Sequence, residues 1–384
     1  MFYFCGRQKD NAMNGQTFIF GKPVEGDFFT DREVETKRLA ANFKGGISTF
    51  LISPRRFGKT SLVKKVIGLV QSDELKVVFV DVFKCKSPIE FAETVASAVL
   101  SQTSSKTEEF LENAKSFLGR LNIGLNLSPD PSSTFDIRLG LSDDKSDISN
   151  ALDVPEKIAA KKNIKIVVCI DEFQQIGEFS DTTAFQKELR TIWQHQKNVT
   201  YCLFGSRKHM MESLFDTTEK PFFKFGDIIY LKTIPLNYWL EFITRKFEAA
   251  GKTITLQQVE QICEAVHYHS SYVQQLCWYV FLSSSDVVSS EDINNGIDEL
   301  ICQNTYLFES WTEHLATYQM RFLMAVADGV HDGLSSADVI SRYRLMSSAN
   351  VTAVKKSLLD KSLIYIEERK VYLTDPVMGL WLKR

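Results

Sequence analysis

The sequence lacks the features that mark membrane, secreted and disulfide-bonded proteins. No apolar run approaches the roughly 20 residues needed to span a bilayer. The first seven residues lack a signal peptide's order of basic and then apolar positions, and Met13 is an alternative start, so we expect residues 1–14 to be unstructured. The seven cysteines include no Cys-x-x-Cys pair, which argues against a cysteine metal site. We therefore expect a cytoplasmic protein with no membrane partner.

The composition is that of an ordinary globular protein. A formal net charge of −3 excludes the bulk basicity of a dedicated nucleic-acid binder, and 384 residues are enough for two or three domains. From residue 47 to about residue 231, predicted strands alternate with helices. We expect these strands at Ile47–Ser53, Lys76–Val82, Ile166–Ile170, Thr200–Phe204 and Asp227–Leu231. This alternation predicts an α/β fold with a mostly parallel sheet.

Residues 50–60 combine a buried strand, a phosphate-binding loop and the start of a helix. The sequence of residues 53–60 is Ser-Pro-Arg-Arg-Phe-Gly-Lys-Thr, in which Ser53 replaces the usual first Gly of a Walker A motif. A P-loop needs backbone N–H groups aimed at phosphate oxygens, a Lys that reaches the β- and γ-phosphates, and a hydroxyl for Mg²⁺. Lys59 and Thr60 supply the last two groups. We expect a nucleoside triphosphate to be bound by Ser53, Pro54, Arg55, Arg56, Phe57, Gly58, Lys59, Thr60 and Ser61.

A second buried strand ends in two carboxylates, as a Walker B motif does. The apolar, β-branched run Ile166–Ile170 is followed directly by Asp171 and Glu172. Because open α/β sheets bind ligands at the carboxyl ends of their strands, these acids are expected near the P-loop. Asp171 would then hold Mg²⁺, and Glu172 would activate the water that attacks the γ-phosphate. The absence of an Asn-Lys-x-Asp element favours ATP over GTP.

Residues 119–145 interrupt the alternation of strands and helices. Leu121, Ile123, Leu125 and Leu127 alternate with polar residues, and a similar alternation resumes after the turn-rich stretch 128–133. The pattern predicts a β-hairpin with one apolar face. Such a hairpin either covers a sheet edge or offers a docking surface for a protein partner.

The pattern becomes helical after residue 235. We expect a lid at 235–310, with helices near Tyr238–Ile243, Leu256–Val266 and Tyr272–Leu282, and a winged helix at 311–384. The winged helix would contain helices Gln319–Ala327, Ser336–Tyr343 and Asn350–Leu359, then strands Leu363–Glu367 and Lys370–Leu373. Ser335 and Ser348 are the expected N-cap residues of the last two helices. The remaining boundaries are an N-terminal segment at 1–27 and an ATPase domain at 28–234.

The chain resembles the archaeal ATPase family, of the STAND class of AAA-related P-loop ATPases. Five short segments carry the resemblance: the Phe-x-x-Arg-Glu box at 29–33, the P-loop, Asp-Glu-Phe-Gln at 171–174, Gly-Ser at 205–206, and Thr-Asp-Pro at 374–376. The lid segment 269–275 is similar to the family's Gly-His-Pro-Tyr-Tyr-Val-Gln motif, although its Pro and Gly are absent. His269 is retained.

The resemblance implies more than the residues alone. It implies a sheet of order 5-1-4-3-2, ATP with Mg²⁺, and a switch-like role. It places Phe29 and Arg32 beside the adenine, Ser206 at the position that senses the γ-phosphate, and His269 in the lid's contact with nucleotide. Arg207 and Lys208 follow the sensor, either as an arginine finger or as an exposed basic pair.

The winged helix leaves two interpretations open. Residues 335–384 contain nine basic and five acidic side chains, a net charge of +4, which suits duplex DNA. The expected recognition helix, 350–359, carries few groups suited to base edges, which suits intramolecular or protein contacts instead.

These observations predict an ATP-hydrolysing switch of the STAND and AAA type, in which attack of water on the γ-phosphate is coupled to movement of the lid and the winged helix. The alternatives are a nucleotide-gated scaffold and a DNA-binding regulator, each with negligible hydrolysis. The sequence sets neither the oligomeric state nor the identity of a partner.

Overall fold

The computed structural model describes residues 17–103, 124–128, 136–140 and 145–384. The alternative start Met13 and the apolar positions Leu121 and Ile123 lie outside these residues. The chain divides into two units, which are described separately. The sheet unit comprises Asp31–Thr233 and Lys356–Arg369, and the helical unit comprises Met1–Thr30, Ile234–Lys355 and Lys370–Arg384.

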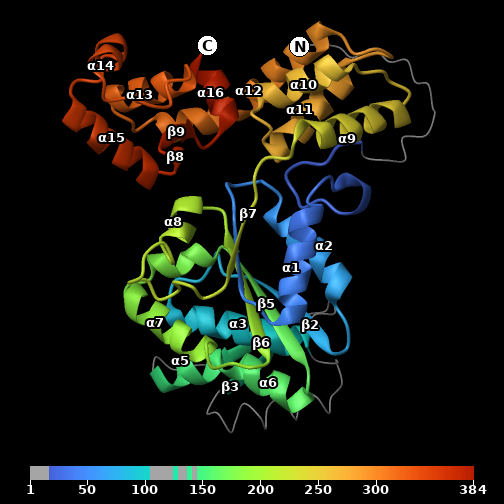
Figure 1. Cartoon of the computed structure of the whole chain (residues 1–384), viewed down its shortest axis with the longest axis vertical. Helices are drawn as coiled ribbons and strands as arrows, with labels where there is room; N and C mark the ends of the chain where they lie inside the picture. The colour runs from blue at the N-terminus through green and yellow to red at the C-terminus, as the bar shows by residue number, and fades with distance from the viewer. Residues whose placement is uncertain (1–16, 104–123, 129–135, 141–144) are drawn as a thin grey trace. The chain divides into compact units, whose positions relative to one another are not determined.

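The sheet unit is built on five parallel strands in the order β2-β5-β6-β1-β7 (Figure 1). Their bounds are β1 Thr49–Ile52, β2 Leu75–Asp81, β5 Lys165–Asp171, β6 Val199–Gly205 and β7 Asp227–Tyr230. Counted along the chain within this sheet, the order is 2-3-4-1-5, which confirms the expected 5-1-4-3-2. Each predicted strand is present, and no end differs from the prediction by more than two residues.

Helices cover both faces of this sheet. One face packs against the α3, α6 and α7 helices in a large aromatic and aliphatic core that includes Phe91, Ile158 and Leu189. The intervening strand residues, such as Leu51 and Cys169, are also fully buried, on the face that α1 and α2 cover. The bounds are α1 Glu33–Gly45, α2 Lys59–Val70, α3 Pro88–Gln102, α5 Lys145–Leu152, α6 Val154–Lys162, η2 Phe173–Glu178, α7 Thr182–Trp193 and α8 Lys208–Glu212. Burial on both faces explains why the strands are continuously apolar.

The predicted hairpin is present as two antiparallel strands, β3 Gly124–Ser128 and β4 Asp136–Gly140. Leu125 pairs with Leu139, and Leu127 pairs with Ile137. A docking role for the hairpin stays a prediction.

The helical unit contains the expected lid helices and one more. The helices of this segment are α9 Leu236–Ala249, α10 Leu256–Ala265, α11 Ser270–Ser283 and α12 Ser290–Thr312. The long α12 helix, which the sequence analysis did not delimit, begins with a capping box between Ser289 and Asp292. A short η1 turn, Gly26–Phe28, precedes Thr30, and Phe18 packs against Phe242, Phe247 and Phe281.

The C-terminal elements follow the order of a winged helix: α13 Thr317–Ala327, α14 Ala337–Tyr343, α15 Ser348–Asp360, the two-stranded wing β8 Ile364–Glu367 and β9 Lys370–Leu373, and α16 Pro376–Leu382. No helix among the described residues is both long and apolar enough to cross a membrane.

Both N-cap predictions in the winged helix were wrong by one residue. Ser336, not Ser335, caps α14 by accepting a hydrogen bond from the backbone N–H of Val339. Ser347, not Ser348, accepts the equivalent bond from Asn350 at the start of α15. Each site offers two adjacent serines with the same intrinsic preference, so the path of the chain into the helix decides which one caps it.

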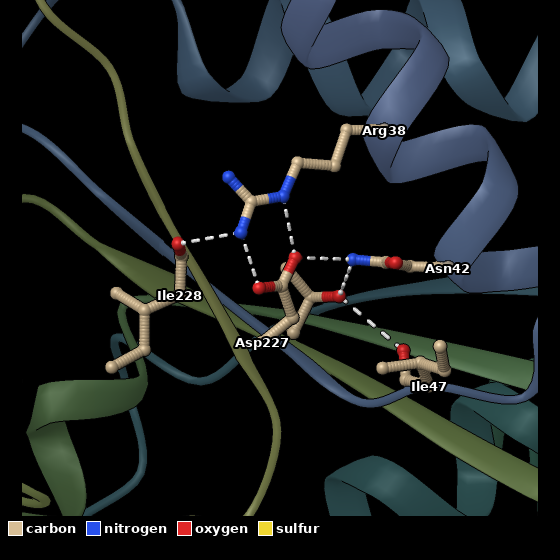
Figure 2. A network of polar contacts seen from close by, with 6 residues as sticks. Arg38, Asn42, Ile47, Asp227 and Ile228 are labelled. Atoms are coloured by element: carbon tan, nitrogen blue, oxygen red, sulfur yellow. Dashed lines mark hydrogen bonds and ion pairs between the residues drawn. The ribbon is translucent and has the colours of Figure 1, made fainter.

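A partly exposed polar network ties the α1 helix to the amino ends of β1 and β7 (Figure 2). The Arg38 guanidinium donates to both carboxylate oxygens of Asp227, with Nε–Oδ2 at 2.8 Å and Nη2–Oδ1 at 2.5 Å. Asn42 Nδ2 also donates to Asp227 Oδ2 at 2.8 Å and to Thr49 Oγ1 at 3.1 Å. Burial alone would raise the pKa of Asp227, but the hydrogen bonds from Arg38 and Asn42 outweigh it and hold the pKa below its ordinary value.

We predict that Asp227→Asn destabilises the protein by about 0.5–1 kcal/mol near neutral pH, because Arg38 loses a bidentate charged partner in a pair that water partly screens. Since the folded-state pKa of Asp227 lies below its unfolded value, this stability is present above the unfolded pKa and is lost as pH falls through the folded pKa. Urea unfolding near neutral pH and near pH 3 should therefore show a difference between wild type and variant that shrinks in acid.

Asp73→Asn is the matched control, because the Asp73 carboxylate is fully exposed and its ion pair with Lys76 should contribute little. An Asp227→Asn variant that unfolds like wild type near neutral pH would contradict the role assigned to the network.

Candidate functional site

Strand register brings the predicted site residues to one edge of the sheet. β6 lies between β5 and β1, with Ile52 opposite Gly205 and Ile170 opposite Leu203. Because all three strands run parallel, the residues that end or follow them lie at the same edge. The P-loop after β1, the carboxylates ending β5, and Ser206 after β6 therefore converge.

The P-loop ends in a left-handed residue that begins the α2 helix. Gly58 has φ +89° and is the N-cap of α2, with its carbonyl accepting from Leu62 N–H at 2.9 Å. A side chain at this φ would be strained, which is the reason for glycine here. The first N–H groups of α2 follow directly and have no partners within the helix, so the loop and the helix start form an anion-binding arrangement.

Lys59 is buried and its ammonium group contacts the start of the loop. Nζ donates to Ser53 O at 3.0 Å, Ser53 Oγ at 3.0 Å and Pro54 O at 2.8 Å. Burial lowers the pKa of Lys59 to about 8, although the charges of Asp171 and Glu172 oppose the shift. The lysine is therefore positively charged at neutral pH in a site with little water to screen it.

Ser53 makes contacts that a glycine could not make. Its hydroxyl accepts from Lys59 and donates to Pro54 O at 3.0 Å, and the residue is only 1% exposed. The departure from the usual Gly thus gives Lys59 one extra acceptor within the loop.

The two carboxylates of β5 have different surroundings. Asp171 Oδ2 accepts from Thr60 Oγ1 at 3.2 Å, and its Oδ1 accepts from the Glu172 N–H at 2.9 Å. Burial and then the charge of Glu172 raise the pKa of Asp171 to about 6, against the opposing effects of these hydrogen bonds and Lys59. Glu172 has a left-handed backbone with φ +55°, and its Oε2 accepts from Ser206 Oγ at 2.9 Å.

Thr60 and Asp171 are a suitable pair of ligands for Mg²⁺. Their oxygens are already within hydrogen-bond distance, and hard oxygen donors are what this ion prefers. Burial first, and then the negative charge of Glu172, raise the pKa of Asp171, and a bound divalent cation would favour its ionised form. Across the described part of the chain, no cluster of three or more His, Cys, Asp or Glu could hold a metal, so phosphates and waters would complete the coordination.

The remaining predicted site residues are divided between the units. Arg32 is 3% exposed, and its guanidinium donates to Lys232 O at 2.6 Å and Phe57 O at 3.5 Å, so it braces the end of the P-loop. Arg55 and Arg56 are exposed, whereas Ser61 is buried. Phe29 and His269 belong to the helical unit.

Two residues that lacked an assigned role also belong to the site. Gln174 donates from Nε2 to Glu172 Oε2, and Gly205 leaves space for the Gln174 amide. Both stood in the quoted family motifs, but only their approach in space shows what they contact. Arg207 forms an ion pair with Glu178 at 2.6 Å, so its side chain has a partner within the sheet unit.

Two parts of the chain match described protein families. Residues 29–276, more than half of the chain, match a family described as an ATPase domain predominantly from Archaea. Residues 306–384 match a family described as a probable winged helix domain. No curated protein sequence is significantly similar to this chain.

Solved structures share the fold across nearly the whole length. A Walker-type ATPase of Pyrococcus abyssi is 15% identical with a TM-score of 0.67, covering 96% of this chain and 100% of its own. The ORC2 protein of Aeropyrum pernix, in ADPNP–ADP complexes, is 13% identical with a TM-score of 0.56, covering 98% of this chain and 97% of its own. At these identities the likeness establishes a common architecture.

We predict that nucleotide affinity falls as pH rises above about 8, because phosphate oxygens favour the charged form of Lys59. Affinity should change little between the pKa of Asp171, about 6, and that of Lys59, about 8, and should decrease by up to about tenfold per pH unit above the latter. Calorimetric titration with ATP in buffers of different ionisation enthalpy should show proton uptake near pH 8.

Lys65→Gln serves as the control, because Lys65 is an exposed residue of the same helix and its loss should leave the proton uptake in place. Affinity that does not change across this pH range would contradict the assignment of Lys59 as the group that titrates.

Proposed function

Because the chain belongs to the family of ATPase domains found predominantly in Archaea and ends in a winged helix domain, we propose that it is an ATP-hydrolysing molecular switch. The observation that carries the proposal is the convergence of Lys59, Asp171, Glu172 and Ser206 at one sheet edge. Two of the required contacts, Thr60 to Asp171 and Ser206 to Glu172, are already formed.

The triphosphate is bound by the P-loop and the start of α2. Backbone N–H groups of the loop, from which Pro54 supplies none, surround the β- and γ-phosphates, and the positive end of the helix dipole favours their charge. Lys59 exchanges its contacts with the loop carbonyls for the phosphate oxygens. Phe29, Arg32 and His269 are proposed as further nucleotide contacts, on the strength of the family resemblance.

Thr60 and Asp171 would hold Mg²⁺ beside the phosphates. When bound, the ion neutralises charge on the β- and γ-phosphate oxygens. Asp171 is ionised above about pH 6, so its carboxylate is available at neutral pH.

Glu172 acts as the general base. Its carboxylate orients a water and takes a proton from it as the water oxygen bonds to the γ-phosphorus. The bond from the γ-phosphorus to the bridging oxygen breaks, the pair of electrons stays with ADP, and the proton passes to the released phosphate. The Ser206 hydroxyl, which donates a hydrogen bond to Glu172, would respond to the presence of the γ-phosphate.

The output of the switch is movement of the lid and the winged helix. We assign the lid to residues 235–310 and the winged helix to residues 311–384. Within the helical unit, the hydroxyl of Tyr272 in α11 donates to the carboxylate of Asp375. Asp375 also accepts from the backbone N–H groups of Val377 and Met378 and so caps α16. His269, the N-cap residue of α11, lies with its ring 4.7 Å from that of Tyr272. A shift at the start of α11 would therefore be passed to the winged helix.

A DNA-binding regulator is the second candidate, favoured by the net charge of +4 over residues 335–384. On α15, Lys356 and Thr352 are exposed, whereas Val351 and Val354 are buried, so this face would contact phosphates more than bases. Salt-dependent binding to duplex DNA would support this role, and its absence would favour a protein partner.

We predict that Glu172→Gln lowers the steady-state rate of ATP hydrolysis by about hundredfold or more while ATP remains bound, because the amide cannot accept the water's proton. Turnover is measured by phosphate release, and affinity by titration with a fluorescent ATP analogue. Glu178→Gln is the control, since Glu178 is an exposed carboxylate of the same segment that pairs with Arg207.

Equal rates near background for wild type and Glu172→Gln, with nucleotide still bound, would overturn the proposed hydrolysis. The protein would then be a nucleotide-gated scaffold.

A further inference from the structure

The proposed base is contacted by a buried amide that the mechanism above does not use. Gln174 belongs to η2, two residues after Glu172, and its Nε2 donates to Glu172 Oε2. Ser206 Oγ, which follows β6, donates to the same oxygen at 2.9 Å. Two donors from two different elements therefore meet one oxygen of the carboxylate.

The amide of Gln174 lies in a space that only a glycine leaves open. Gln174 is 4% exposed. A Cβ atom built on Gly205 would lie 1.7 Å from Gln174 Oε1 and 2.9 Å from its Cδ. Any side chain at position 205 would force the amide away from Glu172. Since Gly205 has no left-handed backbone, space rather than conformation requires glycine here.

The other end of this amide has no compensating contact. Gln174 Oε1 is buried and has no hydrogen-bond partner among the described residues. A buried acceptor without a partner costs free energy, so an apolar side chain of the same size would pack here at least as well. What such a side chain would not supply is the Nε2 donor to Glu172.

Glu172 needs this support because its backbone does not fix its side chain. The residue is the N-cap of η2 in a left-handed conformation, and its side chain forms no capping bond. Without Gln174, the carboxylate is restrained by Ser206 alone and can rotate about that single contact. Bonds from both donors to Oε2 leave Oε1 as the oxygen that neither residue occupies.

We propose that Gln174 is a positioning residue for hydrolysis, which holds Glu172 so that Oε1 faces the attacking water, and that Gly205 provides the space this requires. The inference rests on the proposed function, because it assigns Gln174 a part in the same reaction. In this proposal, Gln174 acts through Glu172 and does not itself touch the nucleotide.

The test compares Gln174→Met with wild type. Methionine has a similar size but no donor, so the fold and nucleotide binding should be retained while Glu172 loses its second anchor. We expect kcat to fall by about tenfold or more, with the dissociation constant for ATP and the thermal midpoint little changed. Gln175→Met is the matched control, because the Gln175 side chain donates to Glu178 at 3.1 Å. The hydrogen bond from Gln175 to the Glu172 carbonyl comes from the backbone N–H, which methionine retains.

A second pair of variants tests the space at Gly205. Gly205→Ala should lower kcat as Gln174→Met does, because the added methyl group displaces the amide. In a Gln174→Ala background the displaced atoms are gone, so adding Gly205→Ala should cause little further loss of kcat. This non-additivity is expected only if position 205 acts through Gln174.

The outcomes separate this inference from the proposed function. A wild-type rate equal to that of Glu172→Gln would overturn the ATPase mechanism and the role of Gln174 with it. An active wild type with an equally active Gln174→Met would overturn only the role of Gln174. A loss of kcat matched by an equal loss of ATP affinity, or by a lower thermal midpoint, would show that Gln174 serves packing and would also overturn the proposal.

Discussion

Burial of the Lys59 ammonium group beside the carboxylates of Asp171 and Glu172 is the constraint from which the rest of the site follows. Desolvation disfavours charge, so it lowers the pKa of Lys59 to about 8 and raises that of Asp171 to about 6. Both groups remain charged at neutral pH because each lies near groups of opposite sign or hydrogen-bond partners. A phosphate chain and a divalent cation would supply the charges that these groups favour most, which supports the proposal that the site binds a nucleoside triphosphate with Mg²⁺.

The sheet determines where these charges meet. Because β5, β6 and β1 are adjacent and parallel, three segments that are far apart in the sequence end at one edge. The amino ends of the strands, on the opposite side of the sheet, carry contacts of a different kind. There, Arg38 and Asn42 bind Asp227 and hold α1 to the start of β7, which is at the margin of the sheet (Figure 2). One end of the sheet thus carries the candidate chemistry, and the other carries contacts that stabilise the fold.

The proposed coupling between hydrolysis and movement would depend on a small number of side-chain contacts. In the sheet unit, Ser206 and Gln174 both bond to Glu172, so any change at the γ-phosphate that moves Ser206 also changes the restraint on the base. In the helical unit, Tyr272 joins α11 to the cap of α16 through Asp375. In each set of contacts, the two bonded residues can be replaced separately and together. Single and double substitutions can therefore measure how strongly the two residues depend on each other.

The sequence alone determined the parallel sheet, its strands to within two residues, the P-loop with Lys59 and Thr60, the carboxylates ending β5, and the winged helix. These features follow from local periodicity, from the chemistry of one short loop, or from motifs whose residues are adjacent in the chain. Only the tertiary structure decided that Ser336 and Ser347 cap their helices, that Asp227 binds Arg38, and that Gln174 reaches Glu172 past Gly205. Those contacts depend on how closely segments that are distant in the sequence approach in space. Gly205, for example, lies 31 residues after Gln174 in the chain. The conformational preferences of a single residue do not encode the position of such a neighbour.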